Sequence, residues 1–157
     1  MVLGDERITA HQERLKGYRS ALANHGIRYD EKLVLRAFTH SSGAYEETKR
    51  IFSEPNPPDG LFITNNQLTI RVLPALQELG VRLSADVLVA CFDDLPLADV
   101  LNPGLTAVQQ PTYDLGRRAA ELLLDRIESP IGVTREVLLT PRLIVRGSSR
   151  RPANTAS

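Results

Sequence analysis

The chain has 157 residues with 42% hydrophobic content, enough to bury the core of one ordinary domain or of two small lobes. Its 19 basic and 19 acidic residues cancel, so net charge does not favour DNA, an anionic membrane or an acidic substrate. The single cysteine, Cys91, excludes an internal disulfide, and no stretch approaches the roughly 18 apolar residues of a membrane span. Without a secretion signal, we expect a soluble, cytoplasmic protein.

Strand and helix patterns alternate along the first two thirds of the chain. The predicted helices cover 8–27, 41–54 and 65–80. The predicted strands cover 32–38, 61–64 and 87–92. The last strand is continuously apolar, as expected for a parallel strand that is covered on both faces. This order predicts an α/β fold with a parallel sheet.

Local signals predict how these helices begin. Thr9 and Gln12 are spaced as a capping box for the first helix. Either Asn65 or Asn66 should cap the third helix. Pro74 should kink that helix, because proline lacks a backbone donor and crowds the preceding turn.

The last third of the chain predicts a strand over 105–110, a helix over 111–128 and an extended run over 135–147. The polar tail, 148–157, is expected to be disordered. Only residues 1–4 precede the first helix, where an α/β sheet normally supplies a full strand. This short start and the broad apolar face of the last helix suggest that a partner lobe is missing.

Candidate binding residues follow the predicted strands, since ligands of open α/β sheets bind beyond the carboxyl ends of the strands. The side chains that follow the strands, or reach their ends from the first helix, are Arg14, Phe38, Asn65, Asn66, Asp93 and Asp94. An aromatic face beside charged and amide groups suits a polyhydroxylated, sugar-like ligand. The same residues also fit a structural interpretation, in which Asn66 caps a helix, Phe38 lies in the core and the Asp pair opens a turn.

The two adjacent acids are not expected to share a metal. Neighbouring residues at a strand end point to opposite sides, so only one of Asp93 and Asp94 can face the crevice. The three histidines, His11, His25 and His40, do not have metal-ligand spacing. We therefore predict neither a metal nor another cofactor.

A hydrolase site can also be considered. Ser41 or Ser42 with His40 and Asp93 would supply the residue types of a catalytic triad. The chain lacks the Gly-x-Ser-x-Gly elbow that places such a serine, and adjacency in sequence does not create a triad. We predict that the protein is not an enzyme.

Several blocks carry a family resemblance through their order and spacing, among them "ERLKGYRSALANHGI", "FDDLPLADVLNPGLTAVQQP" and "PRLIVRGSS". Over nearly its whole length, the chain resembles the effector-binding region of the LacI/GalR family of bacterial transcription regulators. The resemblance implies the fold of type I periplasmic sugar-binding proteins, two α/β lobes that hold a small ligand between them. Residues 5–104 and 141–147 then form the C-terminal lobe, and residues 1–4 and 105–140 a partial N-terminal lobe.

The resemblance also implies that this chain is truncated at its N-terminus. It lacks the helix-turn-helix headpiece, so operator DNA is an expected partner only of a parental protein that carries one. Ligand-dependent lobe closure would there reposition two headpieces in a dimer.

Residue by residue, the resemblance places effector contacts, with a sugar or sugar derivative as the expected ligand, at Arg14, Phe38, Asn65 and Asp93. It places the homodimer interface at Ile70 and Leu101. At Asn66 many relatives have aspartate, so this pocket is less acidic. The alternatives are a solute-binding protein for carbohydrate uptake, which shares the fold, and a small hydrolase.

Overall fold

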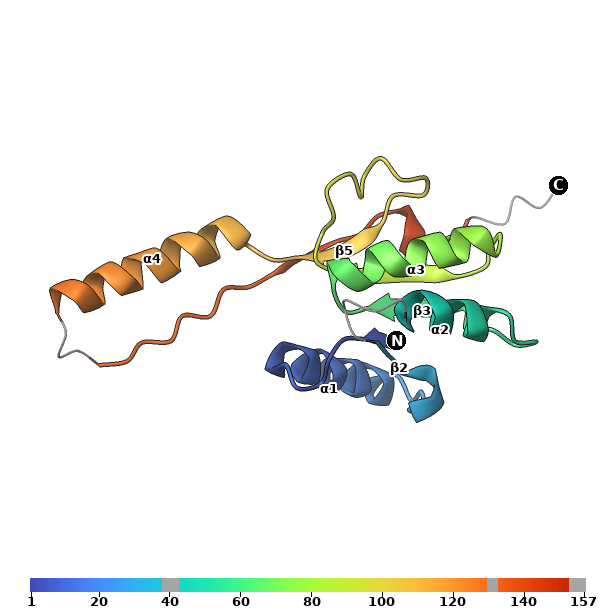
Figure 1. Ribbon diagram of the computed structural model, residues 1–157, viewed down its shortest axis with the longest axis horizontal. Coiled ribbons are helices and arrows are strands. Elements are labelled where there is room, and N and C mark those ends of the chain that lie inside the picture. The colour runs from blue at the N-terminus through green and yellow to red at the C-terminus, as the bar shows by residue number, and fades with distance from the viewer. Residues whose placement is uncertain (38–42, 130–132, 153–157) are drawn as a thin grey trace.

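A six-stranded sheet forms the centre of the molecule (Figure 1). The computed structural model describes residues 1–37, 43–129 and 133–152. Its strands are β1 (Val2–Leu3), β2 (Leu35–Arg36), β3 (Gly60–Ile63), β4 (Leu88–Phe92), β5 (Thr106–Gln109) and β6 (Arg142–Ile144). The strand order is β2-β1-β3-β4-β5-β6; neighbours pair in parallel except β6, which is antiparallel to β5. The predicted α/β class with a parallel sheet is confirmed.

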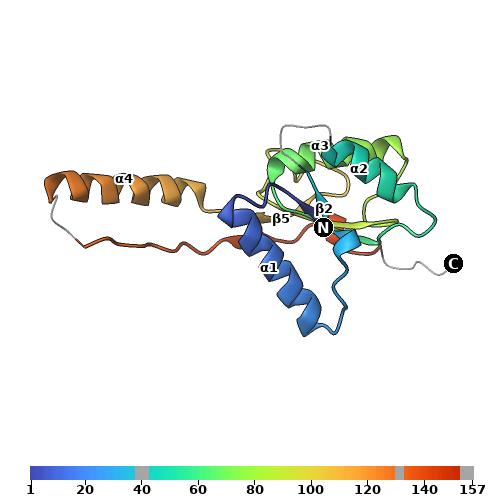
Figure 2. The ribbon, with the colours of Figure 1, turned by 60° about the horizontal axis from the view of Figure 1, so that its bottom comes forward.

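The helices cover the sheet unequally. They are α1 (Thr9–Asn24), α2 (Gly43–Phe52), α3 (Asn66–Glu78) and α4 (Thr112–Glu128), with short 3-10 turns η1 (Glu31–Leu33) and η2 (Gly147–Ser149). Helices α2 and α3 lie on one face of the sheet and α1 on the other (Figure 2). Helix α4 extends away from the sheet, and residues 133–141 return toward it (Figure 1).

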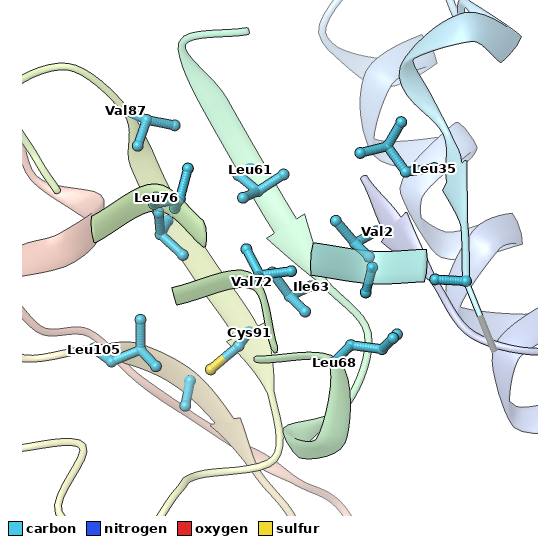
Figure 3. Close-up of a cluster of buried hydrophobic side chains, with 14 of the residues drawn as sticks. Val2, Leu35, Leu61, Ile63, Leu68, Val72, Leu76, Val87, Cys91 and Leu105 are labelled. Atoms are coloured by element: carbon cyan, nitrogen blue, oxygen red, sulfur yellow. The ribbon is translucent and has the colours of Figure 1, made fainter. Parts of the chain in front are cut away.

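The main core lies between α3 and the strands β3 and β4 (Figure 3). Leu68, Val72 and Leu76 repeat every four residues on α3, and none is more than 1% exposed. Alternate residues of β4, Val89 and Cys91, are buried on the same side of the sheet. Burying side chains of this size stabilises the fold by about 1.5–3 kcal/mol each. Burial also raises the pKa of the Cys91 thiol to about 11, as expected for an inert core cysteine.

A smaller cluster attaches α1 to the opposite face. Leu15 of α1 packs with Leu3 and Val34, and Tyr18 and Phe62 border the cluster. Within α1 only His11 and Leu15 are buried. The first turns of the helix are therefore held against the ends of β1 and β3, while its later turns are largely exposed.

Two local predictions were wrong. Thr9 and Gln12 form no capping box, because Ile8 holds the extended N-cap position and Thr9 is already helical; Gln12 Nε2 instead donates to Glu6 O at 2.8 Å. The strand predicted over 32–38 is reduced to β2. Asp30 accepts a hydrogen bond from the backbone of Lys32 at 2.9 Å, and this cap starts the turn η1 where a strand was expected.

Residues near both ends of the described chain join the central sheet. Val2, expected in the partial second lobe, pairs with Leu35 and Ile63 inside the sheet. Of the tail, residues 148–152 are described, and they begin against the sheet: the Ser148 hydroxyl is buried, accepts from Thr106 N at 2.8 Å and donates to Val89 O at 2.7 Å. These hydrogen bonds join the chain end to two strands. The division of the remaining chain into two lobes stays a prediction.

Candidate effector-binding site

Arg14 is held at the carboxyl ends of two neighbouring strands. Its Nη1 donates to Thr64 O at 2.5 Å, directly after β3. Its guanidinium carbon lies 3.7 Å from the centre of the Phe92 ring, the last residue of β4. Burial lowers the pKa of Arg14, while the nearby Asp93 carboxylate raises it; arginine nevertheless remains charged. The cation–π contact with Phe92 and the hydrogen bond to the Thr64 carbonyl together hold the Arg14 guanidinium beside the residues that follow β3 and β4.

Asn65 caps α3. Its Oδ1 accepts from Leu68 N at 2.8 Å, its backbone is extended, and only 8% of the residue is exposed. The prediction of a cap at Asn65 or Asn66 is thus resolved to Asn65. The cap uses one oxygen, and Nδ2 makes no hydrogen bond to the described residues. A ligand could therefore be bound through Nδ2 while the helix stays capped.

Asp93 follows β4 in a left-handed backbone conformation, with φ +71°. Its N–H donates to Val108 O at 3.0 Å, which extends the pairing with β5 by one residue. Gln110 Nε2 donates to Asp93 Oδ1. The carboxylate thus lies at the end of β4, beside the residues that leave β5.

Asp94 points to a different partner. Arg146 Nη1 and Nη2 donate to its two carboxylate oxygens at 2.7 and 3.0 Å, and Arg146 also donates to Leu105 O at 2.7 Å. The two side chains are only 12% and 19% exposed. The adjacent acids therefore face different partners, and Asp94 forms an ion pair with Arg146 in the segment after β6.

The structure brings three of the four predicted effector contacts together. Arg14 touches Thr64 and Phe92, which directly precede Asn65 and Asp93. Phe38, the fourth, lies outside the described residues. Arg14, Phe92 and Gln110 also line a mostly apolar groove of about 870 Å³ between α1, the sheet and the start of α4.

His11 lies at the same end of the sheet, against Gly4, which follows β1. The sequence analysis tests it only as a possible metal ligand. It is 5% exposed, and its Nδ1 is buried without a partner among the described residues. Burial and the nearby Arg14 lower its pKa, and Asp5 and Asp93 raise it. The glycine that follows β1, Gly4, is a sequence signal that another side chain packs closely there. The sequence does not show that this side chain is His11.

Other features restrict the chemistry. Within the described ranges, no group of three or more His, Cys, Asp or Glu side chains could hold a metal ion. No helix in the described part of the chain is long and apolar enough to cross a membrane.

The predicted interface residues Ile70 and Leu101 are 49% and 40% exposed, and Leu97 and Val100 of the same loop as Leu101 are 70% and 68% exposed.

Comparison with known proteins gives a consistent result. The model of the periplasmic binding protein-like domain matches residues 1–149. The chain is 30% identical over 136 residues to the ribose operon repressor of Escherichia coli (strain K12), covering 87% of this chain and 41% of that one. It thus spans less than half the length of the curated relatives it matches.

Two solved structures are also similar. A LacI family transcriptional regulator from Enterococcus faecium with bound ribose has a TM-score of 0.83 at 27% identity, covering 96% of this chain and 56% of that chain. The transcriptional regulator CelR in complex with cellobiose has a TM-score of 0.82 at 32% identity, covering 94% and 45%. The resemblance to LacI-type regulators is confirmed, and the chain belongs to the periplasmic binding protein-like domain family.

Proposed function

We propose that the chain is the sugar-binding and dimerising portion of a LacI/GalR-type transcription regulator, in which ligand binding modulates DNA binding by a headpiece outside these residues. One observation carries the proposal: Arg14, Asn65 and Asp93 gather at the carboxyl ends of β3 and β4. Guanidinium, amide and carboxylate groups together can donate to and accept from the hydroxyls of one sugar. Two similar structures contain bound ribose and cellobiose, which supports a sugar as the ligand here.

No catalytic step is assigned to this site. Asp93 makes its side-chain hydrogen bond with Gln110, and Cys91 is buried with a raised pKa. Neither arrangement supplies an activated nucleophile with its base. The relatives named above are regulators, which favours ligand binding without turnover.

The direct test is thermal unfolding of the 157-residue chain with D-ribose or cellobiose. A sugar at one hundred times its Kd should raise the Tm by about 5–10 °C. Asp93→Ala should abolish this rise. The matched control is Asp59→Ala, because Asp59 precedes β3 at the opposite end of the sheet and its side chain is 89% exposed. A chain that responds to neither sugar, or an Asp93→Ala chain that responds as the wild type does, would contradict the proposal.

The dimer is a separate part of the proposal. Ile70 lies on α3 away from the buried stripe of Leu68, Val72 and Leu76, and Leu101 is exposed in the loop before β5. Apolar residues off the core stripe suit an isologous interface. Sedimentation velocity should show a dimer that Ile70→Asp or Leu101→Asp converts to monomer. Gln67→Asp, an exposed change on the same helix, should leave the dimer intact; a monomeric wild type would refute this interface.

A further inference from the structure

His11 and Arg14 contact the carboxyl end of the sheet from the same side of α1. They are three residues apart, which places both side chains on one face of the helix. His11 and Leu15 are the buried residues of α1, and Leu15 packs into the smaller core cluster. His11 is thus the buried side chain that holds the first turns of α1, which carry Arg14, against the strand ends.

The contacts of His11 and Arg14 are joined through Thr64. Arg14 donates to Thr64 O at 2.5 Å, and the Thr64 hydroxyl accepts from Gly4 N at 3.2 Å. Gly4 in turn lies against the imidazole of His11. Thr64 is fully buried and His11 is 5% exposed. The helix, the residue after β1 and the residue after β3 therefore form a closed loop of contacts, in which a change at His11 reaches the Arg14 guanidinium.

The charged groups that act on the His11 imidazole come from three elements. Burial, the largest effect, lowers the pKa of His11, and Arg14 on the same helix lowers it further. Asp5, after β1, and Asp93, after β4, raise it, but Asp5 is already paired with Arg7 at 2.6 Å. His11 Nδ1 is buried and has no hydrogen-bond partner among the residues that the structure describes. The ring is therefore neutral at neutral pH, and a second proton on it would be enclosed without an acceptor.

We propose that His11 is a positioning residue for effector binding: its neutral ring, packed against Gly4, holds α1 where Arg14 can contact the ligand, and a proton on the ring weakens binding. The proposal rests on the proposed function, because it takes Arg14 as an effector contact. A charged imidazole would repel the Arg14 guanidinium and attract the Asp93 carboxylate, for which it would compete with ligand hydroxyls. Proton binding to His11 and effector binding should therefore oppose one another, and this linkage is reciprocal.

NMR titration of the His11 ring tests its contact with Arg14 without a ligand. The chain has three histidines, so the His11 signal is identified by its loss in His11→Gln. Arg14→Met removes a positive charge near the ring and should raise the pKa of His11. Arg19→Met changes an exposed arginine of the same helix and should leave that pKa as it is in wild type. Equal pKa values of His11 in wild type and Arg14→Met would overturn the proposal.

The pH dependence of binding is the second measurement, made with whichever of D-ribose and cellobiose binds the wild type in calorimetry. Between pH 7.5 and pH 5.0 the affinity should fall about threefold more in wild type than in His11→Gln. The same sugar at saturation should lower the pKa of His11, because the neutral ring is the form that binds. His25→Gln, at an exposed histidine that follows α1, should retain the wild-type pH dependence. An affinity that falls as steeply in His11→Gln as in wild type would also overturn the proposal.

Binding at pH 7.5 separates positioning from a general loss of stability. His11→Ala removes the ring beside Gly4 and should weaken the affinity about tenfold, whereas the amide of His11→Gln fills much of the same space and should retain it. Val34→Ala is the matched control: it removes buried atoms from the smaller core cluster, so it should lower stability without changing the affinity of the folded chain. Unchanged affinity in His11→Ala would refute the positioning role. If neither sugar binds the wild type, the proposed function fails, while the NMR titrations still decide whether His11 and Arg14 are coupled.

Discussion

The imidazole of His11 lies directly against the backbone of Gly4. A Cβ atom added at Gly4 would be 2.5 Å from His11 Nε2 and 2.6 Å from Cε1. Atoms do not approach so closely without a shift, and His11 is buried at 5% exposure, so its ring has little room to move. The absence of a side chain at Gly4 is therefore what allows α1 to approach the end of β1.

Gly4→Ala should destabilise the chain by about 1–3 kcal/mol because of this overpacking. Urea denaturation measures the change. Gly17→Ala is the matched control: its Cβ would meet no atom within 4 Å, and replacing a helical glycine should stabilise by about 0.5–1 kcal/mol. In the double variant Gly4→Ala/His11→Ala the loss at Gly4 should largely disappear. Equal effects at Gly4 and Gly17 would show that the ring does not occupy this space.

His11 should make stability depend on pH. Burial, then Arg14, lowers its pKa in the folded chain, so the unfolded chain binds a proton more readily. Its contribution is therefore complete above the unfolded pKa of about 6.5 and is lost as pH falls below that value. The Tm measured from pH 7.5 to pH 5.5 should fall more in wild type than in His11→Gln.

The control for this profile is His25→Gln. His25 is exposed at the end of α1, where its Nδ1 lies 2.9 Å from Ala21 O. This variant should retain the wild-type dependence on pH. If His11→Gln and wild type lose stability in parallel, protonation of His11 is not coupled to folding.

Two substitutions separate the role of Asn65 as the cap of α3 from its proposed role as a ligand contact. Asn65→Ala removes the cap of α3 and should cost about 1 kcal/mol of stability. Asn65→Asp keeps the oxygen that accepts from Leu68 N but removes the Nδ2 donor, so stability should be retained while the thermal response to a sugar is lost. A sugar response that survives in Asn65→Asp would assign Asn65 to the helix cap alone.

Arg146 should contribute much more to stability than arginines of α4. Arg146→Met removes a bidentate contact to Asp94 and a bond to Leu105 O, leaving the carboxylate largely enclosed. We expect a loss of about 2 kcal/mol in urea denaturation. Arg117→Met is the control, since Arg117 and Glu121 are both 42% exposed, and solvent screening leaves their pair little to contribute to stability. Similar losses in the two variants would argue against an enclosed ion pair.

The sequence was sufficient for elements that carry a strong local pattern. Four-residue spacing on α3 fixes which face of that helix is buried, and the apolar run over β4 marks a strand inside the sheet. Gly80, at φ +70°, ends the third helix as glycine commonly does. Because these elements place the ends of β3 and β4, Asn65 and Asp93 could be selected as neighbours before their contacts were known.

Contacts between distant residues could not be predicted in the same way. Arg146 and Asp94 are 52 residues apart, and Ser148 reaches Val89 across 59 residues. Neither pair has a periodic signal, because each depends on how β6 turns back along β5 and where η2 ends. The strand β1 could not be predicted either, because two residues are too short for a recognisable pattern. It is a strand because Val2 pairs with Leu35 and Ile63 on its two sides.

Helix α4 has consequences for how the chain opens. None of its residues is buried, and Leu123, Leu124 and Ile127 are 58–65% exposed. Its backbone hydrogen bonds are thus separated from the cooperative unit formed by α3, β3 and β4. Amide protons of α4 should exchange with solvent through local fraying, whereas those of β4 should wait for unfolding of the whole sheet. The chain therefore contains two levels of protection, and the boundary between them lies at Gln110 and Pro111.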